Sequence, residues 1–430
     1  MKNSIYNSII KVNDSFGLLY NAMSDKFVVL KGEALKNAGE NNIDEIKDKD
    51  DGLYCQMVEI GGVVDDGVDE TEELRSLIKS IDGDDTVFHL HVNPTLDCNF
   101  RCWYCYENHL KGSKMEAGMV ERVRRLIDNR MSAMKHLKHF QLSFFGGEPL
   151  MYFGQVAKPL IEHSESAAAE RGVGFSVHFT TNGFLFSDRI FQFLDGKDAS
   201  FQITLDGGKA SHDKTRFCAD GRGSYDRIVG NIKRLAEQGH SVILRINYTA
   251  ANASGINGIV EEFALLPPEA KNRIRIDFQQ VWQDSGNWKD AELNVNQCMS
   301  KARENGLVVT SGRMVNMVRN SCYGDRLNHL LVNYNGDVFN CTARDFKSQN
   351  RSGYLSEDGE FVVENDMVGR RMRAKFSNPA CHKCRIAPIC AGGCTQKAVE
   401  HLGTKSCIFG YKEKDIDKLI LDRFVYRYVN

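Results

Sequence analysis

Short apolar runs of strand length recur between residues 87 and 282, and helical spacing of apolar residues fills the stretches between them. The runs are VFHLHVN (87–93), HFQLSFF (139–145), GFSVHFT (174–180), SFQITL (200–205), SVILRINYT (241–249) and RIRIDFQQVW (273–282). Segments 119–134 and 224–238 carry the helical pattern most clearly. Strands that alternate with helices predict an α/β fold with a parallel sheet. Six such strands predict a partial (β/α)6 TIM-like barrel over residues 86–309, with reactive groups at the carboxyl ends of its strands.

The pattern differs on either side of this region. Residues 1–85 alternate apolar runs such as FGLLYNAM with acidic segments, which predicts a small α+β domain with a hairpin and winged-helix-like elements. Residues 310–412 consist of short segments around cysteine pairs, so bound metal is expected to hold this domain together. Residues 413–430 predict a closing C-terminal helix.

Composition narrows the class of protein. The 430 residues are 42% apolar and 26% charged, which is typical of a soluble globular chain. The net charge of -2 argues against nucleic-acid binding, because no basic excess is present to neutralise phosphates. The first residues lack the apolar core of a signal peptide, and no run approaches membrane-spanning length, so we expect a cytoplasmic protein without a membrane partner. Thirteen cysteines in such a chain favour metal binding or catalysis over disulfides.

The densest chemistry lies in TLDCNFRCWYCYEN, directly after the first predicted barrel strand. It holds Cys98, Cys102 and Cys105 within eight positions. Three thiolates can bind three irons of a [4Fe–4S] cube and leave the fourth iron open to another ligand. The alternative is a partial zinc site that a distant side chain completes.

The Cx3Cx2C spacing, with Tyr104 just before the third cysteine, resembles the signature of radical S-adenosylmethionine (SAM) enzymes. The resemblance implies that the open iron chelates the amino and carboxylate groups of SAM. One electron from the cluster would then cleave the sulfonium and give a 5'-deoxyadenosyl radical.

Further segments fit the same family. Gly146, Gly147, Glu148 and Pro149 form a GGEP turn after the second strand, which by resemblance binds the amino group of SAM. Glycines there permit a close approach of the backbone to a ligand, although a simple tight turn would also explain them.

Two later strand ends resemble other cofactor-binding segments of the family. Asn182 in TTNGFL and Asp206 in ITLDGG are expected to point toward the ribose or the substrate, or else to serve as turn or helix-capping residues. The segment HDKTR (212–216) resembles a segment found at this point in the peptide-modifying branch. Arg245, two residues before Asn247, is a candidate for the SAM carboxylate, with a structural ion pair as the alternative.

Seven cysteines in the last quarter of the chain resemble the SPASM extension of radical enzymes that mature peptides and proteins. They are Cys322, Cys341, Cys381, Cys384, Cys390, Cys394 and Cys407. The resemblance implies two auxiliary [4Fe–4S] clusters, and therefore three in all. It assigns Cys381, Cys384, Cys390 and Cys407 to one auxiliary cluster, and Cys322, Cys341 and Cys394 to the other. Zinc is the alternative for this region, because CxxC pairs are common in zinc ribbons.

The second of these sets lacks a fourth ligand. Either Cys298 supplies it, or the iron stays open for a substrate thiol. Cys298 lies in an amphipathic helical pattern that favours a buried core cysteine. We interpret Cys55 and Cys218 as packing residues.

The resemblance therefore implies an enzyme that removes a hydrogen atom from a ribosomally made precursor peptide, with reduced flavodoxin or ferredoxin as electron donor. Residues 1–85 are expected to bind the leader of that peptide, for which strand addition to a sheet edge is one route. The product would be a thioether or another crosslink, with an epimerised centre as a further option. The alternatives are a sulfatase-maturating type of enzyme and, in a different class, an iron–sulfur electron carrier. An open iron speaks against the carrier, because a carrier needs fully ligated clusters.

Overall fold

The computed structural model describes residues 1–38, 43–218, 220–286, 288–310 and 316–428. The chain forms two compact units. The sheet unit comprises Asp85–Gly312 and Asn328–Met367. The terminal unit comprises Met1–Asp84, Arg313–Leu327 and Val368–Asn430. Among the described helices, none has the length and apolar character needed to cross a bilayer.

The sheet unit contains all six strands expected from the apolar runs. They are β6 (Val87–Val92), β7 (His139–Phe144), β8 (Gly174–Thr181), β9 (Ala199–Leu205), β10 (Ser241–Tyr248) and β11 (Ile274–Gln280). Neighbours along the chain pair in parallel, which confirms the parallel sheet. Since parallel strands in chain order present their carboxyl ends at one edge, the loops after β6, β7, β8 and β9 share that edge.

The sheet is larger than the six strands expected. β12 (Val308–Thr310) pairs in parallel with β11, and β13 (His329–Val332) pairs in parallel with β6. Three further strands, β14 (Asp337–Phe339), β15 (Gly353–Leu355) and β16 (Phe361–Val363), extend it in antiparallel fashion. The sequence did not reveal them because each has only three or four residues and no alternating pattern.

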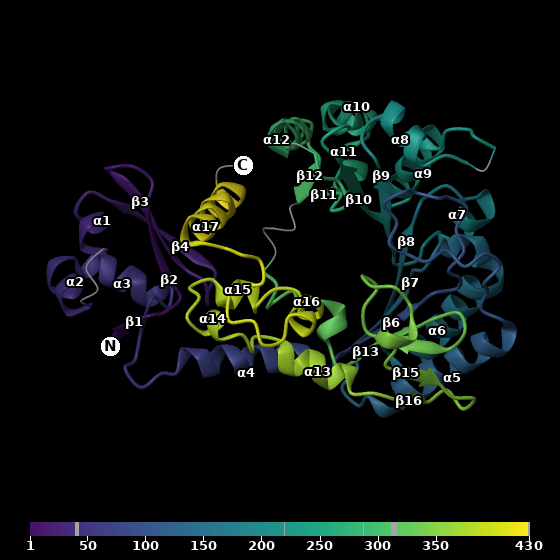
Figure 1. Cartoon of the computed structure of the whole chain (residues 1–430), viewed down its shortest axis with the longest axis horizontal. Helices are drawn as coiled ribbons and strands as arrows, with labels where there is room; N and C mark the ends of the chain where they lie inside the picture. Colours follow the sequence, from purple (N-terminus) through teal and green to yellow (C-terminus); the bar gives the residue numbers. More distant parts are fainter. Residues whose placement is uncertain (39–42, 219, 287, 311–315, 429–430) are drawn as a thin grey trace. The chain divides into compact units, whose positions relative to one another are not determined.

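Helices cover the apolar face of the sheet, as Figure 1 shows for α5 (Ala117–Ala133) and α6 (Lys158–Arg171). The others are α7 (Asp188–Leu194), α8 (Lys209–Thr215), α9 (Tyr225–Glu237), α10 (Asn257–Ala264), α11 (Pro268–Lys271) and α12 (Trp288–Glu304). Short helical turns lie at η1 (Pro149–Tyr152), η2 (Phe153–Ala157), η3 (Ala253–Gly255) and η6 (Ser348–Asn350). Buried residues such as Leu90, Phe140 and Phe179 join these helices in one core.

The opposite face of the parallel sheet is polar. In the strand register, His91 lies beside Ser143, Ser143 beside His178, and His178 beside Ser200. Register partners in parallel strands point to the same face, so these four form one polar row. His178 is hydrogen-bonded to Ser200 at 2.8 Å, and burial lowers the pKa of His178 to about 4. This face of the sheet is therefore a polar surface suited to hydrogen bonding.

The terminal unit begins with an antiparallel meander of β2 (Asn7–Lys11), β3 (Phe16–Asn21) and β4 (Lys26–Lys31). The predicted hairpin is the β3–β4 pair. Helices α1 (Glu33–Ala38), α2 (Ile43–Lys49) and α3 (Asp51–Glu59) follow, then α4 (Glu70–Asp82). Two short strands, β1 (Lys2–Asn3) and β5 (Val63–Val64), pair separately.

The cysteine-rich end of the chain belongs to the same unit. It holds η5 (Tyr323–Asp325), α13 (Met367–Ala374), α14 (Pro379–His382), α15 (Ala387–Cys390), α16 (Thr395–Glu400) and α17 (Glu413–Tyr428). The predicted closing helix is α17, which lies beside β4 in Figure 1. Ile416 and Ile420 of α17 pack with Tyr20 in a core of this unit. The buried guanidinium of Arg423 forms an ion pair with Asp25, which fixes the helix to the β3–β4 turn.

Candidate functional site

The three-cysteine loop begins directly after β6 and is fixed by its own side chains. Thr95 donates its hydroxyl to the carbonyl of Ser113 at 2.6 Å. The Asp97 carboxylate accepts the backbone N–H of Cys98 at 2.8 Å and that of Gly112 at 2.9 Å. These bonds close the loop at both ends, so the three thiols lie at the carboxyl edge of the sheet, as expected.

The thiols of this loop lie in surroundings that disfavour charge. Burial raises the pKa of Cys98 to about 12, and burial also raises the pKa values of Cys102 and Cys105. Thiols bind metals as thiolates, so a cluster held by these three cysteines would release protons on loading. The positive charge of its irons would offset the solvation that burial removes.

The two glycines of the GGEP turn allow it to contact the cysteine loop. Gly146 has a φ of +105°, and a Cβ there would lie 2.3 Å from the carbonyl oxygen of Thr95. A Cβ on Gly147 would lie 2.0 Å from the carbonyl oxygen of Asp97. Gly147 and Glu148 donate their backbone N–H groups to these two carbonyls at 3.0 and 2.9 Å. The glycines therefore serve contact between two backbones, a role that the motif alone does not reveal.

Glu148 is fully buried and holds three neighbouring groups. Its carboxylate accepts the Thr181 hydroxyl at 2.6 Å, the Asn182 backbone N–H at 2.7 Å and the Leu150 backbone N–H at 3.0 Å. Burial raises its pKa, and these bonds oppose the rise. Pro149 follows as the first residue of η1, for which Glu148 is the N-cap. The turn after β7 is thereby tied to the end of β8.

Asn182 links that end of β8 to the cysteine loop. Its side-chain amide donates to Asn99 Oδ1 at 2.8 Å and lies 3.8 Å from the Cys98 sulfur. Its own carbonyl oxygen accepts the backbone N–H of Phe184 at 3.0 Å. Asn182 thus caps a turn, as one of its two interpretations expects, and it also reaches the first cysteine. Its role toward the ribose or the substrate stays a prediction.

Tyr104 and Asp206 meet at the carboxyl ends of β6 and β9. The Tyr104 hydroxyl is 2.7 and 2.6 Å from the two Asp206 oxygens and accepts a hydrogen bond from Arg216 at 2.9 Å. The guanidinium of Arg216 lies 3.8 Å from Asp206. Burial raises the pKa of Asp206, while the charge of Arg216 and the bond from Tyr104 lower it. Arg216 belongs to the HDKTR segment, but its contact with this pair was not predicted.

Arg245 lies on β10, with Asp277 as its register partner on β11. Its Nε donates to Asn247 Oδ1 at 2.9 Å. Both Arg245 and Asn247 favour the ionised form of Asp206, which opposes the effect of burial on the pKa of that carboxyl. Arg245 therefore belongs to the same polar cluster as Asp206.

Glu107 is a candidate that the sequence did not single out. It is buried, and among the described residues neither carboxylate oxygen has a hydrogen-bond partner. Burial, with a smaller effect of Asp345, raises its pKa to about 9. No motif marks it, and only its position two residues after Cys105 would have drawn attention to it.

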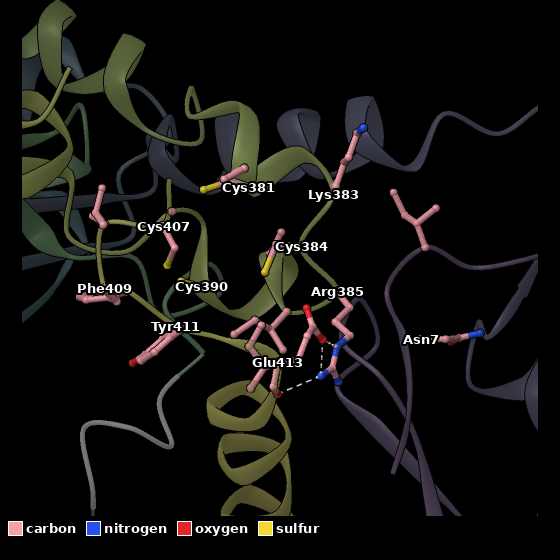
Figure 2. A pocket seen from close by; sticks show the side chains of 17 residues that line it. Asn7, Cys381, Lys383, Cys384, Arg385, Cys390, Cys407, Phe409, Tyr411 and Glu413 are labelled. Carbon is pink, nitrogen blue, oxygen red and sulfur yellow. Dashed lines mark hydrogen bonds and ion pairs between the residues drawn. The ribbon is translucent and has the colours of Figure 1, made fainter. Parts of the chain in front are cut away.

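Four cysteines of the terminal unit line one cavity of about 440 Å³, shown in Figure 2. They are Cys381, Cys384, Cys390 and Cys407. The cavity walls are mainly apolar and include Ile386, Ile408 and Phe409. Burial raises the pKa of Cys381 to about 11 and that of Cys390 to about 12. Four soft ligands around one apolar space fit the donor set of a [4Fe–4S] cluster.

Arg385 closes one side of this cavity. It donates to the Glu413 carboxylate at 2.9 Å and to Asp417 at 2.7 Å, as the dashed lines in Figure 2 mark for Glu413. Glu413 begins α17, so this contact joins the cysteine cavity to the C-terminal helix.

The remaining cysteines of the tail lie in both units. Cys322 precedes η5 and Cys394 precedes α16, both in the terminal unit, whereas Cys341 follows β14 in the sheet unit. Within the terminal unit, Asp325 accepts the Thr395 hydroxyl at 2.6 Å, which fixes the Cys322 segment to the Cys394 segment.

The isolated cysteines have different surroundings. Cys298 is fully buried in α12, and its thiol contacts the carbonyl oxygen of Ile256 at 3.6 Å. Cys218 is partly buried against the core of the sheet unit. The packing role expected for Cys55 is wrong, because its side chain is exposed. Helix α3 buries the face that carries Leu53 and Met57, and Cys55 points to the other side.

Within the described residues, no three His, Cys, Asp or Glu side chains converge closely enough to hold a single metal ion. A zinc ion needs its ligands within about 2.3 Å of one point. Each sulfur of a cubane set binds a different iron, so its ligands stay farther apart.

Comparison with known proteins defines the class. Residues 92–262 match the family described as the Radical SAM superfamily. The chain therefore contains a radical SAM domain.

Two relatives cover most of the chain. It is 21% identical over 414 residues to the radical SAM cyclopropyl synthase TigE of Paramaledivibacter caminithermalis, covering 88% of this chain and 83% of the relative. It is 25% identical over 370 residues to the cysteine-type anaerobic sulfatase-maturating enzyme of Clostridium novyi, covering 75% and 93%.

Solved structures share the fold. The enzyme anSMEcpe with bound AdoMet aligns with a TM-score of 0.60 at 16% identity, over 80% of this chain and 98% of that one. Streptococcus suis SuiB bound to S-adenosylmethionine aligns with a TM-score of 0.54 at 15% identity, over 96% and 99%. SuiB has also been solved with its precursor peptide SuiA. The expected α/β radical SAM fold is thus confirmed.

Proposed function

We propose that this enzyme is a radical SAM peptide maturase that installs a crosslink in a ribosomally made precursor peptide. The observation that carries the proposal is the cysteine loop after β6, which the GGEP turn holds at the carboxyl edge of the sheet. That edge is where parallel α/β folds collect their reactive groups.

Three sets of cysteines would hold three [4Fe–4S] clusters. Cys98, Cys102 and Cys105 would hold the first, and the four cysteines lining the terminal-unit cavity would hold the second. Cys322, Cys341 and Cys394 would hold the third. Three or four thiolates without histidine form the donor set that suits a [4Fe–4S] cubane, which favours cubanes for these sets.

We expect the fourth ligand of the third cluster to come from outside the chain. The Cys298 thiol is buried in a helix of the sheet-unit core and is directed to a backbone carbonyl. Recruiting it would require α12 to unpack. An open iron available to a substrate thiol needs no such change.

With SAM bound at the first cluster, one-electron cleavage supplies the 5'-deoxyadenosyl radical that such enzymes use. The chain's own part is to hold the SAM methionine group and exclude water. An ionised carboxylate offers about four acceptor positions. Glu148 uses three of them internally, which leaves one for the ammonium group.

Arg245 is suited to the carboxylate of SAM. In the described part of the chain its Nε is engaged by Asn247, while its Nη groups make no hydrogen bond. A guanidinium with two free nitrogens binds a carboxylate in a bidentate manner. Asn182, Tyr104 and Asp206 complete the polar ring and are suited to ribose hydroxyls or to the substrate.

Leader binding is assigned to the N-terminal strands and helices. β4 is an edge strand of the β2–β3–β4 sheet. A groove of about 510 Å³ runs along it, lined by residues 26–29 of β4, by Gln56 and Glu59 of α3 with its C-cap Ile60, and by Tyr428. An extended peptide can pair with such an edge and place alternate side chains in the groove.

The comparisons favour a peptide substrate over a sulfatase. Alignment with anSMEcpe covers 80% of this chain and leaves a portion similar in size to residues 1–84. Alignment with SuiB, solved with a precursor peptide, covers 92–96%. Among crosslinks, the name of the cyclopropyl synthase TigE favours a carbon–carbon bond over a thioether. A sulfatase-maturating activity is the second candidate, which the Clostridium novyi relative supports.

Reductive cleavage of SAM tests the proposal. Anaerobically reconstituted enzyme with dithionite and SAM should form 5'-deoxyadenosine, whereas an iron–sulfur carrier should form none. Cys102→Ala should abolish the product, and Cys55→Ala, at an exposed cysteine, should leave it unchanged. Fully loaded protein should contain roughly twelve irons per chain. A precursor peptide with its leader should then lose the mass of two hydrogens. Formation of formylglycine in a sulfatase peptide would instead support the sulfatase-maturating activity.

A further inference from the structure

A second, smaller cavity adjoins the four-cysteine cavity of the terminal unit. Its volume is about 240 Å³, and it shares Cys381, Gly392 and Ile408 with the larger cavity. Its outer side is formed by the loop His401–Lys405. Cys381, a proposed ligand of the second cluster, therefore lines both the larger cavity and the smaller cavity to which this loop contributes.

The segment around these cavities is strongly basic, although the whole chain has a net charge of -2. Between residues 368 and 412 the sole acidic residue is Glu400, whereas the basic ones are Arg370, Arg371, Arg373, Lys375, Lys383, Arg385, Lys397, Lys405 and Lys412. Ion pairs between described residues join Arg371 to Asp325, Lys375 to Asp82, and Arg385 to Glu413. The segment as a whole therefore retains a positive excess.

Three exposed lysines surround the cysteine site. Lys383 lines the larger cavity, and Figure 2 shows its side chain pointing away from Cys384. Lys405 lines the smaller cavity. Lys397 lies over the ring of Phe409 at 5.7 Å, and Phe409 lines the larger cavity. None of the three lysines forms an ion pair with a described residue, so their charge is available to a partner.

An exposed apolar residue lies among these charges. Leu402, which lines the smaller cavity, is 61% exposed. A single exposed leucine is ordinary on a protein surface. Here it lines the smaller cavity together with Lys405 and Cys381, so an apolar and a basic side chain lie together at the proposed redox centre. Protein interfaces combine apolar and polar residues in this way.

We propose that Leu402, Lys383, Lys397 and Lys405 form the docking surface for a flavodoxin, a small acidic protein that carries FMN. This inference rests on the proposed function, since it assumes a cluster at Cys381. Charge complementarity steers such a partner to the basic surface. The apolar edge of its flavin would pack on Leu402, beside Cys381. Electron-transfer complexes are small, with below about 1,200 Å² of buried surface, so docking of such a partner does not require an extensive interface.

Binding of recombinant flavodoxin to the reconstituted full-length enzyme tests the proposal. Affinity is measured anaerobically by biolayer interferometry at low and at moderate salt. The double variant K397E/K405E should weaken binding at least about tenfold at low salt and flatten the salt dependence. Leu402→Asp should weaken binding to a similar extent. The matched control K135E/K138E reverses two exposed lysines of the sheet unit and should change affinity less than about twofold.

Equal losses in both double variants would overturn the proposal, because affinity would then reflect overall charge. Unchanged affinity for flavodoxin in K397E/K405E and Leu402→Asp would also overturn the proposal. So would an equally acidic ferredoxin that binds the same residues more tightly than flavodoxin does. Iron content and circular dichroism show whether the variants fold. Dithionite bypasses any carrier, so wild-type protein that forms no 5'-deoxyadenosine with dithionite refutes the proposed function. Variants that retain the dithionite reaction and lose only flavodoxin binding support the docking surface.

Discussion

The Tyr104 hydroxyl is hydrogen-bonded to both carboxylate oxygens of Asp206, at 2.7 and 2.6 Å. Tyr104 belongs to the cysteine loop after β6, and Asp206 follows β9, so this contact spans the carboxyl edge of the sheet. Arg216 donates to the same hydroxyl at 2.9 Å. The position of the cysteine loop is thereby coupled to residues more than 100 positions later in the chain.

Tyr104→Phe should weaken this coupling. Removal of the hydroxyl leaves the buried Asp206 and Arg216 with one partner fewer, which costs about 1–3 kcal/mol. We expect a lower midpoint of thermal unfolding and about tenfold slower formation of 5'-deoxyadenosine. The control is Tyr106→Phe, since Tyr106 is 39% exposed. If Tyr104→Phe retained wild-type rate and midpoint, the contact would have no role in holding the loop.

Gly147→Ala should separate the GGEP turn from the cysteine loop. The new methyl group would lie 2.0 Å from the carbonyl oxygen of Asp97, so one of the two backbones must move. We expect about four fewer irons per chain after reconstitution, because one cubane is lost. Gly154→Ala is the matched control, since a Cβ there meets no atom within 4 Å. Normal iron content and SAM cleavage in Gly147→Ala would show that the close contact is dispensable.

Cys384→Ala and Cys298→Ala distinguish a proposed ligand from a core residue. Cys384 lines the four-cysteine cavity, whereas Cys298 is fully buried in the sheet-unit core. Cys384→Ala should lose about four of roughly twelve irons and form no crosslinked peptide, yet retain some SAM cleavage. Cys298→Ala should retain all its iron, with a modest loss of stability. Iron loss in Cys298→Ala would instead make it the missing fourth ligand.

The stability of the sheet should depend on pH through His178. Burial lowers the pKa of His178 to about 4, so the folded chain keeps this imidazole neutral at a pH where the unfolded chain binds a proton. The free energy of unfolding therefore falls as pH decreases below about 6.5, by about 1 kcal/mol between pH 7.5 and 5.5. His178→Gln should remove that part of the fall in a urea titration. His136→Gln, at an exposed histidine, should not, and equal slopes in both variants would contradict the assignment.

Val29→Asp should impair leader binding. Val29 lies on the edge strand β4, is 44% exposed and lines the groove beside α3. When an apolar side chain of the peptide binds in the groove, it would remove water from the new carboxylate, which is unfavourable. We therefore expect about tenfold weaker peptide binding, measured by fluorescence anisotropy. Val58→Asp is the control, because Val58 is 43% exposed on α3 outside the groove. SAM cleavage without peptide should be unchanged in both. If Val29→Asp and Val58→Asp bound the peptide with equal affinity, the leader would bind outside this groove.

The sequence predicted the parallel strands and the cysteine loop because both depend on local patterns. The period of apolar residues marked β6 to β11, and the spacing of Cys98, Cys102 and Cys105 marked the cluster loop. The short strands β12 and β13 were missed, since their pairing depends on neighbours distant in the chain rather than on their own sequence. Cys55 was misassigned for a similar reason, because apolar character alone does not reveal which face of a helix is buried.

The side-chain contacts of the candidate site were also beyond local patterns. Gly146 and Gly147 were marked by the GGEP motif, but their contact with the carbonyls of Thr95 and Asp97 depends on tertiary structure. The same holds for Arg216, whose bond to Tyr104 joins residues 112 positions apart. Glu107, whose carboxylate has no hydrogen-bond partner among the described residues, is marked in the sequence only by its position two residues after Cys105.

The pairing of β6 with β13 has a consequence for synthesis on the ribosome. His91 and His329, which contact each other across this pair, are 238 positions apart. At about 5–20 residues per second, translation needs roughly 10–50 s to supply the strand that covers that side of β6. During this interval the nascent chain exposes an unpaired strand beside three reactive thiols. A chaperone that shields this edge, or early delivery of iron and sulfide, would therefore raise the yield of active protein.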